Sequence, residues 1–363
     1  MFRRRAPGTD GPAREGLGDA SAHEPGPGDR HSGGAAGPDR DAGISADAGI
    51  SADAGISADA GISADAGIFG HSEALGSLGA APAGVDASVP HPARIWNYWL
   101  GGRDYFAADR SAGYALGQEF PHVTEIARAE RAFLVRAVRF LAGPARMRQF
   151  LDIGAGLPAG GNTHEIAQRI AVDSGIVYAD HDPVVLAHAR ALLASPMLAS
   201  SPEGVVSYIQ ADLRDVATVL AGSALTLDHG KPVALMMLGV LGYVEDHGAA
   251  RSIASQLMDA LPSGSYLAIA DGVAASAYVE SMQQRYNQSG LAAYRLRRPD
   301  ELASFFDGLD LVEPGVVPCP EWKPDVRSAD RAARGEGIAY CGVARKPLRF
   351  FPIGLHLNNE SPP

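Results

Sequence analysis

Short apolar runs alternate with segments of helical periodicity along the chain from residue 123 onward. Helical spacing of apolar residues is seen at 163–171, from Pro183 onward and at 246–261. Apolar runs of strand length occur at seven places, namely Gln149–Ile153, Gly175–Asp180, 205–209, 232–240, 265–270, 309–317 and 338–344. This alternation predicts an α/β fold with a doubly wound, seven-stranded, mostly parallel sheet, helices on both faces, and ligands at the carboxyl ends of the strands.

A long helix is predicted ahead of the first strand, over residues 123–141. Its apolar residues recur at helical spacing as far as Leu141. Three arginines, Arg128, Arg131 and Arg139, lie off this apolar stripe. We interpret them as part of a solvated face.

Carboxylates stand at the ends of the first two predicted strands. The first strand carries Asp152 and runs into the glycine turn Gly154-Ala155-Gly156, and the second strand ends in Asp180. Glycines let the backbone approach a ligand closely, and a carboxylate accepts hydrogen bonds from ribose hydroxyls. The segment is therefore interpreted as a site for a nucleoside-bearing cofactor. A turn that only closes a strand–helix contact is the alternative.

Two classes of nucleoside cofactor compete for this segment. Residues 154–159 read GAGLPA and fit the G-x-G-x-x-A pattern of dinucleotide sites, with Asp180 about 20 residues downstream. A pyrophosphate at the turn would face the negative charge of Asp152. S-adenosylmethionine has no phosphate, and its positive sulfonium and α-amino group are favoured by a nearby acid. Asp152 therefore favours S-adenosylmethionine over NAD.

The first 87 residues differ in composition from the rest of the chain. They are dense in Gly, Pro, Ala, Asp and Ser, and DAGISA occurs four times in succession from Asp41. One Ile per repeat buries too little surface to offset the entropy of ordering. We expect residues 1–87 to be a disordered tail, 88–349 one folded domain and 350–363 a C-terminal tail. A hexapeptide β-solenoid is the alternative for the repeats, but five copies make too few coils for a stacked core.

Charge and composition limit the partners. The 363-residue chain has a formal net charge of −11, which argues against nucleic acid, although Arg295-Leu296-Arg297-Arg298 is a candidate local basic patch. No run of 18 apolar residues is present, and no apolar stretch follows the basic start as in a secretory signal. Cys319 and Cys341 form no metal spacing. We expect a cytoplasmic protein with no metal and no membrane partner.

An aromatic segment, HPARIWNYWLGGRDYFAADR, occupies residues 91–110. It is interpreted either as an anchor that packs the N-terminal segment onto the domain or as a lid over the cofactor. Tyr and Trp faces attract cations, including a sulfonium. On the second interpretation Tyr98 is a cofactor-binding candidate.

These signals resemble the class I S-adenosylmethionine-dependent methyltransferases. More narrowly, the chain resembles a mostly actinobacterial methyltransferase family long catalogued as a domain of unknown function. The similarity covers nearly all of 90–347 and is carried by HPARIWNYWLGGRDYFAADR, ARAERAFLVRAVRFLA, QFLDIGAGLPAGGNTHEIAQ, VYADHDPVVLAHARALL, ADLRD, PVALMMLGVL, LPSGSYLAIA, FFDGLDLVEPGVVPCPEW and YCGVARKP. It implies a Rossmann-like class I methyltransferase fold with a helical N-terminal lid.

The resemblance also implies roles for individual residues of the cofactor site. Asp152, Gly154 and Gly156 would line the methionine end of the cofactor, and Asp180 would bind the ribose hydroxyls. The adenine would have three neighbours, namely His181, the side chain of Asp212 and the backbone of Leu213.

The chain departs from the family after the fourth predicted strand. Relatives commonly have a Leu-His-Phe-like run there, whereas this sequence has Leu241-Gly242-Tyr243. Tyr243 is then the nearest titratable side chain and the catalytic candidate. Asp104 and His122 are further candidates for a general base, since they lie in the predicted lid or near it.

Three classes of function remain open at this point. The first is a methyltransferase acting on a small-molecule acceptor, the second is a non-catalytic S-adenosylmethionine-binding regulatory module, and the third is an NAD-dependent oxidoreductase. The fold alone does not choose between them.

Overall fold

The structure, a computed structural model, describes residues 81, 85–193, 204–324 and 338–348. The DAGISA repeats and the expected C-terminal tail lie outside the described residues.

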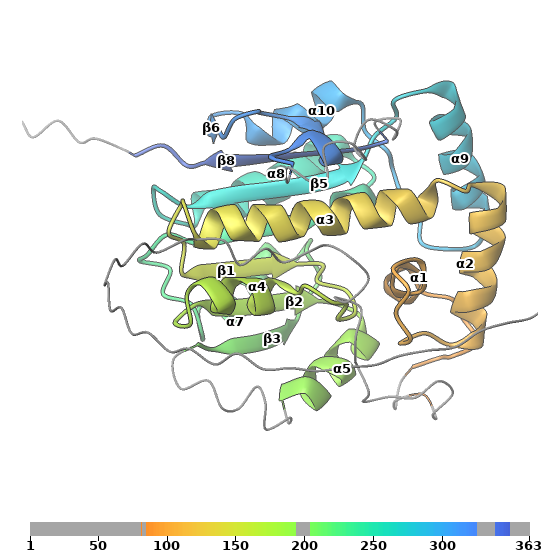
Figure 1. Cartoon of the computed structure of the whole chain (residues 1–363), viewed down its shortest axis with the longest axis horizontal. Helices are drawn as coiled ribbons and strands as arrows, with labels where there is room; N and C mark the ends of the chain where they lie inside the picture. Colours follow the sequence, from red (N-terminus) through yellow and green to blue (C-terminus); the bar gives the residue numbers. More distant parts are fainter. Residues whose placement is uncertain (1–80, 82–84, 194–203, 325–337, 349–363) are drawn as a thin grey trace, which may run out of the picture. The chain divides into compact units, whose positions relative to one another are not determined.

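A single mixed sheet forms the centre of the described part (Figure 1). Its order is β3-β2-β1-β4-β5-β8-β6, and the five strands from β3 to β5 are parallel while β8 is antiparallel to β5. The bounds of the six longer strands are β1 Gln149–Ile153, β2 Gly175–Asp180, β3 Val206–Gln210, β4 Ala234–Leu238, β5 Tyr266–Gly272 and β8 Ala339–Arg345. The doubly wound, mostly parallel sheet that the sequence predicts is thus confirmed.

The predicted continuous strand at 309–317 is wrong. Two short strands occupy its place, β6 Asp310–Leu311 and β7 Val317–Pro318, and both pair antiparallel with β8. Between them Pro314 has no amide hydrogen to donate and Gly315 has a φ of 92°. The sheet therefore has eight strands instead of seven, with β6 and β7 sharing one position along β8.

Helices cover both faces of the sheet. On one face, apolar residues of α3 (Val123–Ala142) and α4 (Thr163–Ile170) pack with Phe150, Met236 and Trp322. The helices that close the core of the other face are α7 Val216–Ser223, α8 His247–Asp259 and α10 Pro299–Ala303, followed by η2 Ser304–Phe306. The remaining elements beside the sheet are α5 Pro183–Leu193, η1 Leu241–Tyr243 and η3 Cys319–Glu321.

Three helices stand together at the end of the sheet where β5 terminates (Figure 1). Two of them, α1 (Pro92–Trp99) and α2 (Ala107–Glu119), are the expected helical lid, and an ion pair between Glu119 and Arg285 joins them to α9 (Ala277–Gln288). The sequence analysis missed α9, although Ser276 caps it and Val279, Met282 and Tyr286 recur at helical spacing. We call α1, α2 and α9 the helical cap.

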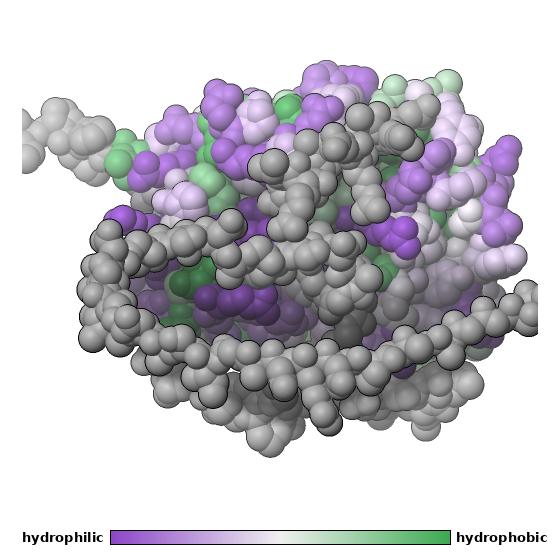
Figure 2. All heavy atoms as spheres, viewed as in Figure 1, coloured by the Kyte–Doolittle hydropathy of each residue, from purple (hydrophilic) through white to green (hydrophobic). Residues whose placement is uncertain are grey.

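The outer surface of the cap contrasts with its inner side. Hydrophilic side chains gather over α9 and α10 on the face shown in Figure 2. On the inner side of the cap, Ile95 and Trp99 of α1 and Leu116 of α2 form an apolar cluster with Met282 of α9. Among the helices of the described ranges, none is long and apolar enough to cross a membrane.

Candidate functional site

Asp152 is fixed between β1 and α4. Its Oδ2 accepts a hydrogen bond of 2.7 Å from the hydroxyl of Thr163, the first residue of α4, and the residue is 5% exposed. Burial raises the pKa of Asp152 to about 6, against the opposing effects of Thr163 and of the positive charge of Arg131. The carboxyl group lies at the base of the glycine turn. Because burial disfavours its negative charge, a cation nearby would stabilise the ionised form.

The glycines of the turn differ in what surrounds them. Gly154 has a φ of 72°, and a Cβ there would lie 2.6 Å from the side chain of Val240. Gly156 has a φ of 62°, and a Cβ there would meet nothing within 4 Å. Gly154 is thus required for packing against the segment after β4, whereas Gly156 leaves its backbone facing open space.

Asp180 ties the end of β2 to the glycine turn. Its Oδ2 accepts from the backbone N–H of Gly156 and its Oδ1 from that of Asp182, each over 2.9 Å. Each oxygen keeps a further lone pair for a ribose hydroxyl. Asp182, directly ahead of α5, accepts from the N–H of Val184 over 2.8 Å, and its other oxygen lies 2.9 Å from Nδ1 of His91.

Arg131 is not on a solvated face, so that interpretation of its side chain is wrong. Its guanidinium donates to the carbonyls of Ala159 and Gly160 and to Oδ1 of Asn162, at distances of 2.6 to 3.2 Å. Burial lowers the pKa of Arg131, with Asp152 among the groups that oppose the shift. The arginine therefore holds the loop between the glycine turn and α4.

The three predicted adenine neighbours lie at the ends of β2 and β3. The His181 imidazole is 66% exposed, and its ring centroid is 5.8 Å from that of His91. Both carboxylate oxygens of Asp212 accept bonds of 2.9 Å from Arg214, while Leu213 is buried in the core. Arg214 also donates to the carbonyl of Tyr243 over 2.7 Å and so connects this edge to η1.

Tyr98 faces α2 within the cap. Its ring packs edge-on against Tyr105, with centroids 5.3 Å apart, and a Cβ at Gly113 would lie 2.8 Å from it. Asn97 of α1 contacts the loop that follows the glycine turn, where its Nδ2 donates to the carbonyl of Pro158 over 3.4 Å. Sequence reasoning missed Asn97, because an amide inside an aromatic run carries no signal of its own.

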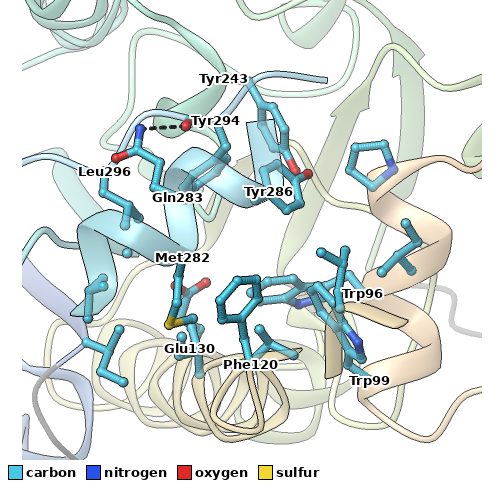
Figure 3. A pocket seen from close by; sticks show the side chains of 18 residues that line it. Trp96, Trp99, Phe120, Glu130, Tyr243, Met282, Gln283, Tyr286, Tyr294 and Leu296 are labelled. Carbon is cyan, nitrogen blue, oxygen red and sulfur yellow. Dashed lines mark hydrogen bonds between the residues drawn. The ribbon is translucent and has the colours of Figure 1, made fainter. Parts of the chain in front are cut away.

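The other candidate bases do not gather around Tyr243. Oδ1 of Asp104 lies 3.3 Å from Nε2 of His188 on α5, and Nδ1 of His122 lies 3.1 Å from Glu125 on the exposed side of α3. Tyr243 is half-buried, lies beside Tyr286 in the pocket wall (Figure 3), and packs edge-on against Tyr294 at 4.9 Å between centroids. Burial raises the pKa of Tyr243 well above its usual range, so this hydroxyl is a hydrogen-bonding group and a poor base at neutral pH.

Two charged side chains hold the loop that carries Tyr243. Asp271, at the end of β5, accepts from the backbone N–H of Gly242 over 3.0 Å, and burial raises its pKa to about 7. Arg297 donates to the carbonyls of Leu241 and Val244 over 2.8 and 2.6 Å. Arg297 is 2% exposed, so it does not contribute to a basic surface patch, and the prediction of a patch at 295–298 is wrong for this residue.

An apolar pocket lies between the helical cap and the ends of β4 and β5 (Figure 3). It holds about 820 Å³ of empty space, a volume that includes open solvent. Eighteen residues line the pocket, and the aromatic ones are Trp96, Trp99, Phe120, Tyr243, Tyr286 and Tyr294. Glu130 of α3 is the acidic residue in the lining.

The apolar pocket adjoins the glycine turn through the segment that follows β4. Val240 lies against Gly154, and a Cβ at Gly239 would come within 3.1 Å of Oε2 of Glu130. Tyr243, three residues after Val240, forms part of the pocket wall. A ligand at the turn and a ligand in the pocket would thus share this segment as a common boundary.

The fold and the carboxylate-flanked glycine turn define a class I S-adenosylmethionine-dependent methyltransferase. The model of the S-adenosyl methyltransferase family matches residues 79–347, and the chain belongs to that family. Its cofactor is therefore S-adenosylmethionine. Family membership and cofactor confirm what the resemblance implied.

Two solved structures of similar proteins support the assignment. A DUF574 family protein from Streptomyces avermitilis is 42% identical over 72% of this chain and 99% of its own, with a TM-score of 0.67. A candidate methyltransferase from Thermobifida fusca is 36% identical over 73% of this chain and 98% of its own, with a TM-score of 0.66. No curated protein matches the chain.

Proposed function

We propose that the chain methylates a small molecule bound in the apolar pocket. The observation that carries the proposal is the shared boundary between the pocket and the glycine turn, formed by the segment from Gly239 to Tyr243. It would bring an acceptor in the pocket next to the methionine end of a cofactor at the turn. Alignment of two bound reactants supplies much of the rate enhancement of such displacements.

The residues around the turn fit S-adenosylmethionine. Asp152 supplies negative charge below the turn, Gly156 leaves its backbone open, and Asp180 has lone pairs for two ribose hydroxyls. When bound, the cofactor supplies an activated methyl group on its sulfonium. The chain's own part is to hold the acceptor, to exclude water with the helical cap, and to order the loop of Tyr243 through Asp271 and Arg297.

Tyr243 enters this proposal as a group that shapes the pocket. Its ring packs edge-on against that of Tyr294, and burial raises the pKa of its hydroxyl, so the side chain is a neutral part of the wall. Tyr243→Phe should therefore keep S-adenosylmethionine affinity within about 2-fold and lower turnover by no more than about 10-fold, the value of one neutral hydrogen bond.

The test combines cofactor binding with turnover. Calorimetry should show micromolar binding of S-adenosylmethionine, about −8 kcal/mol, and no saturable binding of NAD. Release of S-adenosylhomocysteine in the presence of a panel of apolar acceptors should then exceed the rate without acceptor. Tight cofactor binding with no turnover on any acceptor would favour the alternative, a regulatory module that binds S-adenosylmethionine.

A further inference from the structure

Glu130 is a buried acid without a partner inside the apolar pocket. It is 5% exposed, and within the described ranges no hydrogen bond or ion pair reaches its carboxyl group. Figure 3 shows it beside Met282 and Phe120, with its oxygens on the pocket side of α3. Leaving a buried polar group unsatisfied is unfavourable, so such a group in the wall of an apolar pocket points to a ligand.

The polar groups of the wall differ in charge. Nε2 of Gln283 donates to the carbonyl of Tyr294 over 2.8 Å, and the tyrosine hydroxyls are neutral groups. The described lining contains no Lys, Arg or His. Glu130 is thus the ionisable acid that the wall offers to a ligand, and it accepts hydrogen bonds when ionised.

The electrostatic surroundings of Glu130 favour a cation. Burial and the neighbouring acid Asp271 both raise the pKa of Glu130 well above its usual range, which means that a second negative charge nearby disfavours its ionisation. A cationic ligand would favour the ionised form of Glu130, because it would pair with the Glu130 carboxylate and lie close to that of Asp271. Tryptophan and tyrosine faces such as Trp96 and Tyr294 add a further attraction for a cation.

We propose that the acceptor is an apolar amine whose nitrogen binds to Glu130 while its hydrocarbon or aromatic part packs against the rings of the apolar pocket. The proposal rests on the proposed function and specifies its substrate class. A neutral amine entering the pocket takes the proton of the Glu130 carboxyl. The O–H bond breaks, an N–H bond forms, and the resulting ammonium and carboxylate cancel each other's charge. For methylation at this nitrogen the proton returns to the Glu130 carboxylate, which frees the nitrogen lone pair to form the new N–C bond as the bond between sulfur and the methyl group breaks.

Other acceptor chemistries fit less well. An anionic acceptor would meet Glu130 and Asp271 with no basic side chain in the described lining to compensate. An alcohol can donate one hydrogen bond to Glu130, but it brings no positive charge. A competing ligand for Glu130 is the α-amino group of the bound cofactor, and the experiment below separates it from the acceptor.

The test uses two probes of the same shape, tryptamine and indole-3-ethanol, titrated into the full chain saturated with S-adenosylhomocysteine so that no turnover occurs. Tryptamine should bind roughly 10- to 100-fold more tightly than the alcohol, the worth of one hydrogen bond to a charged group. This comparison needs no variant. Equal affinities of the two probes would overturn the proposal.

A pair of variants on α3 then assigns the preference to Glu130. Glu130→Gln should reduce the preference for tryptamine to about 3-fold or less and leave S-adenosylmethionine affinity within about 2-fold. Its melting temperature should not fall, since a neutral amide replaces a buried acid. Glu125→Gln, an exposed change on the same helix, should alter none of these quantities.

The outcomes distinguish this proposal from the proposed function. A loss of S-adenosylmethionine affinity in Glu130→Gln with an unchanged probe preference would assign Glu130 to the cofactor and overturn the amine proposal. Failure of the wild-type chain to bind S-adenosylmethionine would instead contradict the methyltransferase function itself.

Discussion

The backbone N–H of Gly156 donates to Oδ2 of Asp180 across 2.9 Å, so that the turn after β1 is tied to the end of β2. The same carboxylate accepts from the N–H of Asp182 through its other oxygen. Asp180 therefore shapes the turn as well as being the predicted ligand of the ribose. Its removal should affect both the cofactor and the fold.

Asp180→Ala should weaken S-adenosylmethionine binding about 30- to 1,000-fold, or about 2–4 kcal/mol, through the loss of two charge-assisted hydrogen bonds partly replaced by water. It should also lower the free energy of unfolding by about 1–3 kcal/mol, because the partly buried N–H of Gly156 and the buried N–H of Asp182 lose their acceptor. Calorimetry and urea denaturation measure the two effects. Asp182→Ala is the control and should cost about 1 kcal/mol of stability through the helix cap, with a smaller effect on binding. The reverse order of binding effects would show that Asp182, and not Asp180, holds the cofactor.

The two glycines of the turn should respond differently to alanine. Gly154→Ala places a Cβ 2.6 Å from Val240 at a positive φ and should lower stability by more than about 2 kcal/mol. Gly156→Ala meets open space, so it should cost only the backbone strain of about 1–2 kcal/mol while weakening cofactor binding about 10-fold or more. Thermal denaturation with and without S-adenosylmethionine separates the two. Unchanged binding in Gly156→Ala would mean that the cofactor does not approach this face of the turn.

Arg297 and Arg298 are adjacent in sequence and opposite in environment. Arg297→Met removes the side-chain donor of the Val244 carbonyl and one of the two donors of the Leu241 carbonyl, which keeps the N–H of Val244. The variant should lower stability by about 2–4 kcal/mol, with a lower turnover from a loosened Tyr243 loop. Arg298 is exposed and pairs with Asp300, so Arg298→Met should change stability by less than about 1 kcal/mol. If urea denaturation shows equal losses of stability for the two variants, Arg297 does not hold η1 in place.

The pairing of His188 with Asp104 should make stability depend on pH. Burial alone would lower the pKa of His188, but its interactions with Asp104 raise it above 6.5 overall. The folded state then holds this proton more tightly than the unfolded state does. The stabilisation is complete below pH 6.5 and disappears as the pH rises through the raised pKa. The difference in unfolding free energy between wild type and His188→Gln should shrink between pH 6 and pH 8; a constant difference would exclude the ion pair as its source.

The N-terminal boundary of the domain can be tested by truncation. The family match starts at residue 79, and Val85 packs against Leu157, Val184 and Val185. A chain starting at residue 79 should keep the full-length melting temperature and cofactor affinity. A chain starting at Ser88, near the boundary predicted from composition, should lose up to about 1.5 kcal/mol through the missing Val85. A large loss in the longer chain would show that residues 1–78 contribute to folding.

The sequence by itself determined where the main strands lie and which cofactor chemistry the turn suits. The expected bounds of β1 and β2 match the structure to the residue, because an apolar run closed by a carboxylate and a glycine turn is a local pattern. The preference for S-adenosylmethionine also came from a local feature, the acid Asp152 just ahead of the turn. The break between β6 and β7 is visible in the sequence as Glu313-Pro314-Gly315. The apolar residues on both sides of it nevertheless led to the prediction of one continuous strand.

Only the tertiary structure decided which polar residues are buried and what they serve. Arg131 and Arg297 looked like solvated charges, yet each closes a loop from a distant part of the chain. Glu130 gave no sequence signal, since an acid on an amphipathic helix is usually solvated. It becomes a pocket residue because α1, α2 and α9 cover that end of α3 and remove the water around it. Neighbours in sequence set the helix and strand propensities, whereas burial and charge environment depend on segments that meet only in the folded chain.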